Sequence, residues 1–551
     1  MNRMRPSRAA FSPKGTHPVR TQYDYIIVGA GSSGCVLANR LSADPSVSVL
    51  VVESGPEDTS PLIAMPRGIG KMLMPGNKHV FDYKVAPRGN APDEVWLKGR
   101  AVGGSSSVNG MVYVRGAPRD YDTWESLGCP GWGWDEMGPL FVALEDHELG
   151  PDTWRGTGGP LHVSMHPSGN PLCEAVLAAA GEVGVPRVAD MNDVDTVRDG
   201  GMGYQPTTTW RGKRFSAAKA FLAPVRSRPN LDVLTDTNVL GIDFTELRAT
   251  GLRIRNKDGE RAVTATREII LSAGAIHSPK LLQLSGIGPA ALLQAHGIPV
   301  LVDAPQVGQN LRDHRYMNMQ YRVTAGSLNS SFSGLGLLAS VANYAIRSKG
   351  PLTHSAHEVG GFVKTRPGLD HADAQIGLGL YSMKLGKKGV EVEKAPGMSI
   401  ISYFTNPESQ GEVRIRSADP SAPPIIEANH FSAEIDRTSF ISLFRWVRNL
   451  VKQPALAKWI VEEITPGPRI ETDDDILQNA IGLGGTTYHV CGTCRMGTDD
   501  EAVLDPQLRV RGVEGLRVVD TSIMPTIVSG NTNAPAMAIG LRAADLILHG
   551  R

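Results

Sequence analysis

Three glycines near the N-terminus have the spacing of a turn that binds a pyrophosphate. Gly29, Gly31 and Gly34 follow the apolar run 24–28, and a second apolar run, 47–52, leads to Glu53. In such a unit the first glycine forms the tight turn, the second lets a pyrophosphate reach a helix N-terminus, and the third lets that helix pack on the strand. The acid binds ribose hydroxyls. Because it would repel a 2′-phosphate, the pattern predicts a dinucleotide other than NADP.

A second candidate binding segment, residues 99–116, is rich in glycine and serine and has no acidic side chain. Gly103 and Gly104 let the backbone approach another molecule closely. The serine hydroxyls, Asn109 and the free N–H groups suit a phosphate-rich or heteroaromatic ligand. Taken alone, the segment is also compatible with a flexible loop, but the dinucleotide unit upstream favours a ligand contact.

The composition limits where the protein is expected in the cell and which partners it is expected to bind. Lysine and arginine number 56, as do aspartate and glutamate, so no net charge recruits nucleic acid or an anionic membrane. No apolar run reaches the ~18 residues of a membrane span, and residues 1–22 lack the apolar core of a secretory signal. The five cysteines suit reduced thiols. We therefore expect a cytoplasmic protein, or one peripheral to the inner membrane, with no nucleic-acid partner.

The apolar pattern indicates a chain that leaves its dinucleotide fold and later returns to it. Residues 231–245 and 250–273 alternate apolar and polar side chains as strands do, and Ser278-Pro279 has the form of a helix start. Residues 515–520 indicate another short buried strand, and residues 534–548 indicate an amphipathic helix. Residues 319–470, with irregular Gly/Ser-rich loops, favour a second domain.

Four motifs, in order along the chain, resemble those of the glucose–methanol–choline (GMC) oxidoreductases. They are the glycine unit with Glu53, the segment 99–109, the run Gly274 to Gly288, and the stretch from Tyr488-His489 to Asn531. The resemblance extends from about residue 23 to residue 548. Within the family, the chain is similar to bacterial choline-dehydrogenase-like alcohol dehydrogenases. The resemblance implies an enzyme that uses FAD to oxidise the CH–OH group of an alcohol.

The resemblance also implies the fold, which we expect to be α/β. A Rossmann-like FAD-binding domain is expected from the separated segments 22–160, 215–318 and 481–551. A substrate-binding domain with an antiparallel sheet and flanking helices is expected over residues 161–214 and 319–480, and residues 1–21 form an N-terminal tail.

The residues expected to contact FAD are carried over from these motifs. The glycine unit holds the pyrophosphate, Glu53 the adenosine ribose and Asp520 the ribityl chain, whereas Val239 lies at the adenine end. Some members attach the flavin through a histidine at the position of Val108; because valine has no nucleophile, we expect a non-covalent FAD. The expected set is Gly29, Gly31, Ser33, Gly34, Glu53, Gly103, Asn109, Gly110, Val112, Val239, Tyr488, Asp520 and Asn531.

His489 and Asn531 are the catalytic pair that the resemblance implies. Oxidation of an alcohol removes a hydroxyl proton and a carbon-bound hydride, and an imidazole takes such a proton near neutral pH. The amide of Asn531 would donate a hydrogen bond to the developing alkoxide. An alternative also stays open. Some relatives with the same fold and a bound flavin are hydroxynitrile lyases, which would use the same histidine in a reaction with no net oxidation or reduction.

The expected substrate is a primary or benzylic alcohol, or an amino alcohol such as choline. Glu358 resembles a position at which a carboxylate attracts the substrate cation in choline-specific members. We favour a dehydrogenase with a quinone or dye as electron acceptor over an oxidase that uses O2. His354 and His357 have a spacing that metals use, but no third ligand accompanies them, so we expect no metal.

Overall fold

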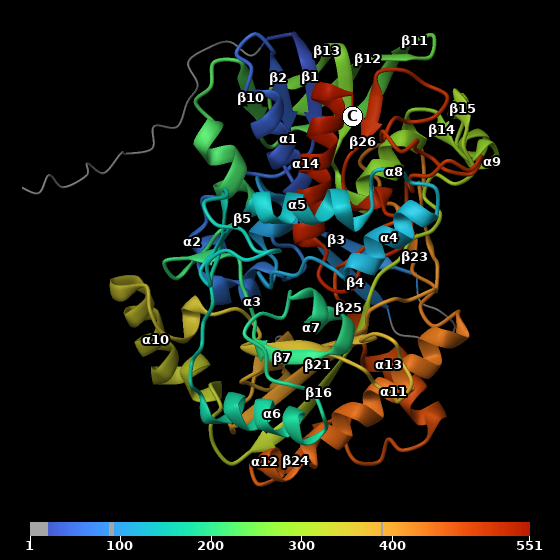
Figure 1. The fold of residues 1–551 in the computed structure, drawn as a ribbon. Helices are drawn as coiled ribbons and strands as arrows, with labels where there is room; N and C mark the ends of the chain where they lie inside the picture. The colour runs from blue at the N-terminus through green and yellow to red at the C-terminus, as the bar shows by residue number, and fades with distance from the viewer. Residues whose placement is uncertain (1–19, 87–92, 387–388, 551) are drawn as a thin grey trace, which may run out of the picture.

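The computed structural model describes residues 20–86, 93–386 and 389–550, so nearly all of the expected N-terminal tail lies outside the described residues. Two large β-sheets, one above the other in Figure 1, each carry their own helices. Among the described residues, no helix is long and apolar enough to cross a membrane.

The upper sheet is a parallel sheet extended by antiparallel strands. Its five parallel strands pair in the order β10, β2, β1, β13 and β26. Strand β12 pairs with β13 in the antiparallel direction, and β11 pairs with β12 in the same way. The central strands are apolar and buried, as is typical of parallel strands covered on both faces. The strands are β1 (Gln22–Val28), β2 (Val49–Val52), β10 (Leu231–Leu234), β11 (Asn238–Thr245), β12 (Arg248–Asn256), β13 (Gly259–Leu271) and β26 (Leu516–Val518).

Two helices from opposite ends of the chain lie together over this sheet. Helix α1 (Ser32–Leu41) follows β1 and packs against α14 (Asn533–His549), as the blue and red helices of Figure 1 show. The Ser33 hydroxyl donates to the Ala536 carbonyl at 2.6 Å, and a Cβ at Gly540 would lie 3.0 Å from the Ser33 carbonyl oxygen. The C-terminal strand and helix therefore return to the first sheet, and the predicted α/β fold of separated segments is confirmed.

The lower sheet is antiparallel throughout. Its order is β24, β16, β21, β18, β17 and β7, and β25 also pairs with β16. Helices α6 (Pro171–Glu182), α11 (Glu434–Val451) and α13 (Asp473–Leu483) contribute apolar residues to its core. The strands are β7 (Gly201–Tyr204), β16 (Arg315–Val323), β17 (Val359–Val363), β18 (Ala374–Gly379), β21 (Gly397–Phe404), β24 (Ile460–Thr465) and β25 (Gly485–Thr486).

The remaining elements connect the sheets or cover them. The helices among them are α2 (Pro61–Ala64), α3 (Ile69–Met72), α4 (Pro118–Ser126), α5 (Trp134–Leu144), α7 (Val194–Asp199), α9 (Ala290–Ala295), α10 (Gly334–Arg347) and α12 (Pro454–Ala457). The short strands are β3 (Val80–Val85), β4 (Glu94–Gly99), β5 (Glu145–His147), β6 (Leu161–Val163), β8 (Thr209–Trp210), β9 (Lys213–Arg214), β14 (Ile287–Gly288), β15 (Val302–Asp303), β19 (Met383–Gly386), β20 (Gly389–Val392), β22 (Glu412–Arg414) and β23 (Ile425–Glu427).

Helix α8 (Gly274–Leu284) begins four residues before the predicted Ser278-Pro279 start. Pro279 has no N–H, so the Ala275 carbonyl one turn earlier has no partner within the helix. The Thr493 hydroxyl donates to that carbonyl at 2.6 Å. A side chain more than two hundred residues away thus provides the hydrogen bond that the proline cannot donate. The helix start predicted from Pro279 is therefore wrong.

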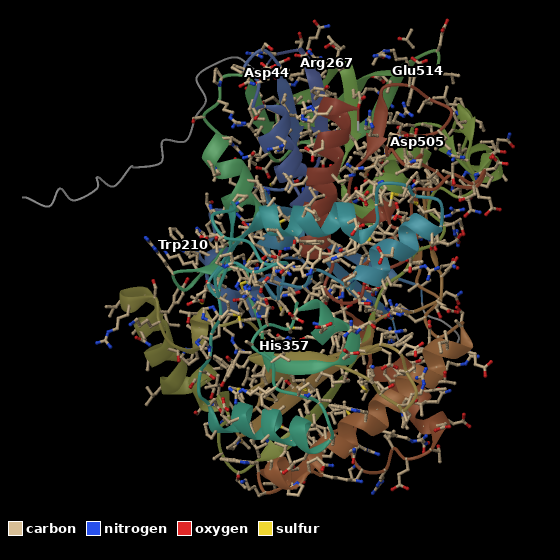
Figure 2. All side chains as sticks on the ribbon, in the orientation of Figure 1. Asp44, Trp210, Arg267, His357, Asp505 and Glu514 are labelled. Carbon is tan, nitrogen blue, oxygen red and sulfur yellow. The ribbon has the colours of Figure 1, made fainter. Side chains whose placement is uncertain are left out.

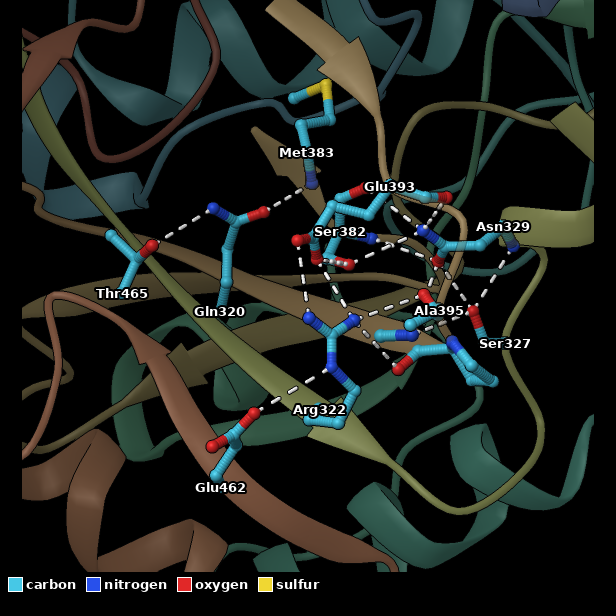
Figure 3. A network of polar contacts seen from close by, with 12 residues as sticks. Gln320, Arg322, Ser327, Asn329, Ser382, Met383, Glu393, Ala395, Glu462 and Thr465 are labelled. Carbon is cyan, nitrogen blue, oxygen red and sulfur yellow. Dashed lines mark hydrogen bonds and ion pairs between the residues drawn. The ribbon is translucent and has the colours of Figure 1, made fainter. Parts of the chain in front are cut away.

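A polar network anchors the turn that leads from the lower sheet to the β19–β20 hairpin (Figure 3). The Asn329 amide donates to the carbonyl oxygens of Ser382 at 3.1 Å and Glu393 at 2.9 Å. Arg322 forms an ion pair with Glu393 at 3.1 Å, and the Met383 N–H donates to the Gln320 amide oxygen at 2.6 Å. The network fixes the backbone on both sides of residues 382 and 383.

Candidate active site

A cavity of about 860 Å³ extends from the upper sheet to the lower one. This volume lies in the upper part of the ~300–1,000 Å³ range of ligand pockets, so it suits a large ligand. Its wall includes the ends of β1 and β2, the start of α8 and parts of β18 and β21. Of the predicted site residues, those lining it are Gly29, Gly31, Ser33, Glu53, Asn109, Gly110, Val112, Val239, Tyr488, His489, Asp520 and Asn531.

The N-terminus of α1 is built to face an anion. Its N-cap residue is Gly31, no side chain caps the first turn, and no acidic residue lies in that turn. The backbone N–H groups of the turn are therefore free to bind a phosphate, which the helix dipole also favours. Gly34 does not line the cavity, but a Cβ there would lie 2.0 Å from the Gly29 carbonyl oxygen. Gly34 therefore supports the turn rather than the ligand.

Glu53 at the end of β2 is held by backbone donors. Its carboxylate accepts from the N–H of Ala30 at 2.9 Å and from the N–H of Gly55 at 2.8 Å. Burial raises its pKa to about 7, although these two hydrogen bonds oppose the shift. A carboxylate has about four acceptor positions, so two remain for hydroxyl donors such as those of a ribose.

The Gly/Ser segment crosses directly over this glycine turn. The Gly103 N–H donates to the Ala30 carbonyl at 2.7 Å, and a Cβ at Gly104 would lie 2.8 Å from the Gly31 Cα. Gly104 lines the cavity, whereas the predicted contact residue Gly103 does not. At Gly110 an added Cβ would meet nothing within 4 Å, so this backbone faces open space.

The N-terminus of α8 provides a second glycine turn, with Asp520 beside it. The Asp520 carboxylate accepts from the Gly274 N–H at 2.9 Å and from the Ser278 hydroxyl at 2.6 Å. Residues 272–277 line the cavity together with Asp520. Tyr488, which also lines the cavity, adopts φ 64°, a left-handed conformation that is uncommon for a tyrosine. Its carbonyl accepts from the Lys98 ammonium at 2.9 Å, which helps to hold this conformation.

His489 belongs to a series of hydrogen bonds in which the donor and the acceptor of each bond can be assigned. His314 Nε2 lies 2.7 Å from the Thr405 carbonyl, which accepts only, so this nitrogen carries the proton of neutral His314. His314 Nδ1 is then an acceptor, and His489 Nδ1 lies 3.0 Å from it and must donate. The remaining ring nitrogen, His489 Nε2, therefore holds a lone pair.

A second series of hydrogen bonds, through Asn531, ends at the same lone pair on His489 Nε2. Asn531 Nδ2 lies 3.0 Å from His489 Nε2 and donates to it. The Asn531 carbonyl oxygen accepts from Gln375 at 3.1 Å, and the Tyr403 hydroxyl donates to Gln375. These bonds fix the orientation of the Asn531 amide, with its N–H₂ group directed at the imidazole.

Both imidazoles of this series are neutral near pH 7. Burial lowers the pKa of His489 well below 6.5, and the neighbouring His314 and Lys98 lower it further. Burial also lowers the pKa of His314 to about 4, although the bond to Thr405 opposes the shift. Neutral rings are what the donor assignment requires, since a protonated His314 has no acceptor nitrogen.

Glu358 is not among the residues that line the cavity, and each of its carboxylate oxygens has a partner. One carboxylate oxygen accepts from Arg67 at 2.8 Å and the other lies 2.9 Å from His354 Nδ1. Burial alone would raise the Glu358 pKa, but the His354 hydrogen bond and the Arg67 charge outweigh it and hold the pKa below its usual value. The structure therefore places this carboxylate in ion pairs with Arg67 and His354 and not on the cavity wall.

The two histidines with metal-like spacing point to different surroundings. His354 pairs with Glu358, whereas His357, labelled in Figure 2, lines the cavity. Among the described residues, no group of three or more histidine, cysteine, aspartate or glutamate side chains is arranged to hold a metal ion.

Several lining or supporting residues were not predicted from the sequence. The sequence predicts a close backbone approach at both Gly103 and Gly104 but a cofactor contact only at Gly103, whereas Gly104 is the one that lines the cavity. His314, Gln375 and Tyr403 lie far from the motifs and carry no local signal of their position. Only the structure brings them next to His489 and Asn531.

A glycine turn for a dinucleotide and a neutral imidazole at one cavity define a dinucleotide-dependent enzyme. Family models described as GMC oxidoreductase match residues 23–316 and 407–540, and the chain therefore belongs to the GMC oxidoreductase family. The family predicted from the motifs is confirmed, as is the prediction of an oxidoreductase.

Relatives of known name are similar over almost the whole chain. An alcohol dehydrogenase (acceptor) from Pseudomonas putida is 39% identical, and the match covers 96% of each chain. An oxygen-dependent choline dehydrogenase from Sinorhizobium medicae is also 39% identical, with the same coverage of both chains. A solved FAD-dependent oxidoreductase from Chaetomium thermophilum superimposes with a TM-score of 0.84 at 30% identity, over 95% of this chain and 99% of that one. These likenesses support FAD as the dinucleotide.

Proposed function

We propose that this protein oxidises an alcohol to an aldehyde with FAD, using His489 as the general base and Asn531 as the partner of the developing alkoxide. One observation carries the proposal. The neutral His489 imidazole lies at the cavity wall with a lone pair on Nε2, and the oriented amide nitrogen of Asn531 lies 3.0 Å from that atom. The named relatives, an alcohol dehydrogenase and a choline dehydrogenase, support the same class of reaction.

The residues fit FAD at both glycine turns. The uncapped first turn of α1 suits the pyrophosphate, Glu53 and Asp520 offer acceptors for sugar hydroxyls, and Gly104 and Gly110 leave room along the backbone. When bound, FAD supplies a two-electron acceptor. We also propose that the two sheets are centres of an FAD-binding and a substrate-binding domain, divided as the sequence predicts.

The proposed role of the pair follows from its hydrogen bonds. A substrate hydroxyl would replace the direct hydrogen bond between Asn531 Nδ2 and His489 Nε2. Its oxygen then accepts a hydrogen bond from the amide, and its O–H donates one to the imidazole. As the proton moves to Nε2, the amide hydrogen bond to the oxygen strengthens because the oxygen gains negative charge. His314 accepts from Nδ1 throughout, so the imidazolium keeps its orientation.

The alternative, a hydroxynitrile lyase, would use the same base without net redox. The two reactions separate in one anaerobic experiment with the FAD-loaded protein. An alcohol that bleaches the flavin absorbance supports the oxidoreductase, whereas cyanide release from a cyanohydrin without bleaching supports the lyase.

The contacts of Glu358 favour an uncharged alcohol over choline. With both oxygens held by Arg67 and His354, this carboxylate does not offer a counter-charge for a quaternary ammonium. Placing a cation in the cavity without a counter-charge is unfavourable. We expect kcat/KM for benzyl alcohol to exceed that for choline by at least ~10-fold, which is about 1.4 kcal/mol.

Steady-state kinetics with both alcohols and a soluble acceptor would measure this ratio. Glu358→Gln is the matched variant: it removes the charge, and we expect the benzyl alcohol to choline ratio to stay the same. If choline were the better substrate and Glu358→Gln removed that preference, the assignment of Glu358 to a structural ion pair would be wrong.

The position of Val108 supports a non-covalent cofactor. Val108 is buried among Ile63, Met72, Val80 and Leu97 and also lines the cavity. Its side chain has no atom that could bond to the flavin. We expect all the FAD to appear in the supernatant after acid or heat denaturation, measured by absorbance. Flavin that stayed with the precipitated protein would contradict this.

We propose that the electron acceptor is a quinone or a dye rather than O2. One relative is named for an unspecified acceptor and another for oxygen. Peroxide measured after air is admitted to the reduced enzyme tests this choice: slow peroxide formation with fast reoxidation by a quinone is expected, and the reverse would indicate an oxidase.

A further inference from the structure

Helix α10 presents its apolar side chains to solvent rather than to the core. Leu335 is 84% exposed, Leu338 66% and Ile346 81%. Along the described part of α10 the only buried residue is Ser340, whose hydroxyl donates to the Ser331 carbonyl at 3.0 Å. A surface helix of a globular protein ordinarily has the opposite arrangement, with apolar residues inward.

The exposed residues of α10 form one continuous face. At 3.6 residues per turn, Leu335, Leu338, Ala342 and Ile346 lie along the same side of the helix. Val341 and Ala345 extend this face, and no charged side chain interrupts it. In Figure 1 the helix lies at the edge of the molecule, where it is free to meet a partner.

The β8–β9 hairpin adds an exposed tryptophan and two cations beside this helix. A Cβ at Gly212, in the turn of the hairpin, would lie 2.4 Å from the Ser348 carbonyl just after α10. Trp210 is 40% exposed, and the Arg211 guanidinium lies over its ring at 4.1 Å. Figure 2 shows Trp210 on the same side of the molecule as α10. Leu62 of α2 is also exposed, and α2 is tied to β9 because Arg214 donates to the Ile63 carbonyl at 3.0 Å.

The stretch of chain that contains α10 has cations but no carboxylate, whereas beside the hairpin the Asp146 carboxylate pairs at 2.7 Å with His162, whose ring stacks on Trp210. Residues 323–357 contain no aspartate or glutamate. The chain nevertheless has no net charge overall, so this local excess of cations is a feature of the surface and not of the composition. The cations near the end of α10 are exposed: Arg211, Lys213, Arg347 and Lys349.

We propose that α10 and the β8–β9 hairpin form a docking surface for an anionic lipid bilayer. An apolar helix face that lies in the interface plane, a tryptophan at its edge and flanking lysine and arginine residues are the features that bind a helix to such a surface. The absence of carboxylates across residues 323–357 complements the negative charge of the lipid headgroups. We call these elements the α10 surface.

The α10 surface adjoins one wall of the cavity. Phe332 lies in the turn that precedes α10, and the Arg67 guanidinium lies 5.0 Å from its ring and 5.2 Å from the ring of Tyr381, which lines the cavity. A bilayer on the α10 surface would therefore bring its apolar phase close to the wall beside Tyr381. Apolar substrates or acceptors that partition into lipid would reach the cavity by a short path.

Flotation of the FAD-loaded protein with lipid vesicles tests the proposal. We expect wild-type protein to bind phosphatidylcholine vesicles that contain phosphatidylglycerol, and to bind pure phosphatidylcholine more weakly. Leu335→Ser/Leu338→Ser/Ile346→Ser is expected to lower vesicle affinity at least ~10-fold. Arg347→Gln/Lys349→Gln is expected to lower it ~10-fold for anionic vesicles and to weaken its dependence on salt.

The matched control replaces exposed apolar residues elsewhere. Val461 and Leu483 are 60% and 61% exposed, and Val461→Ser/Leu483→Ser is expected to bind vesicles as the wild type does. Flavin reduction by a soluble alcohol should be unchanged in all these variants, which shows that they fold. The proposal is overturned if the wild type binds no vesicles. It is equally overturned if the wild type is a dimer that the triple serine variant converts to a monomer, since the face would then bind a second copy.

Discussion

Replacing His489 with alanine is expected to slow flavin reduction by an alcohol at least ~100-fold, which is about 2.7 kcal/mol of barrier. The substitution removes the lone pair on Nε2 and leaves Asn531 without its partner at 3.0 Å. FAD should stay bound, because the glycine turns of α1 and α8 are untouched. Anaerobic stopped-flow measurement of flavin absorbance gives the rate, and the absorbance spectrum gives the FAD content.

A matched control for this variant is His296→Ala. His296 lies at the C-terminal end of α9 and does not line the cavity, so its replacement should leave both the rate and the FAD content unchanged. An unchanged reduction rate in His489→Ala, with FAD bound, would contradict the assignment of His489 as the base.

Replacing His314 with phenylalanine is expected to slow flavin reduction by ~10- to 100-fold, the usual cost of losing a residue that orients a ligand or base. Phenylalanine removes the acceptor for His489 Nδ1–H, which lies 3.0 Å away. The proton on His489 is then no longer confined to Nδ1, and the tautomer with Nε2 protonated, which cannot act as a base, becomes populated. His314 is thus a positioning residue that acts through His489.

The pH profile distinguishes this role from a merely structural one. Because burial lowers the pKa of His489, the base is neutral above that pKa, and wild-type reduction should keep its rate as the pH falls through 6.5. In His314→Phe the rate should be low at every pH above the pKa of His489, because the substitution changes which nitrogen of His489 is protonated and not whether the ring is charged. His314→Gln, with an acceptor and a donor on one amide, should recover part of the rate. A His314→Phe variant as fast as the wild type would contradict these hydrogen-bond assignments.

The glycine motifs could be predicted from sequence because their signals are local. The turn at Gly29 to Gly34 and the strands on either side of it specify their own geometry, and the structure has β1, α1 and β2 where the pattern predicts them. The start of α8 was mispredicted because a distant hydroxyl, that of Thr493, satisfies the carbonyl that Pro279 leaves free. A local rule for proline has no access to that partner.

The hydrogen bonds that support the proposed catalytic pair could not be predicted, because they join residues far apart in the chain. His314 and His489 are separated by 175 residues, Gln375 and Asn531 by 156, and His314 and Thr405 by 91. The partner of Glu358 is also distant in the sequence. Arg67, 291 residues away, pairs with its carboxylate in the fold, and the sequence around Glu358 gives no sign of this partner.

The most direct test of the proposed function is anaerobic titration of the FAD-loaded wild-type protein with uncharged primary and benzylic alcohols. We predict that such an alcohol bleaches the flavin absorbance and that one aldehyde forms for each flavin reduced. If no alcohol bleached the flavin, while FAD remained bound and the protein folded, the assignment of alcohol oxidation to this site would be wrong.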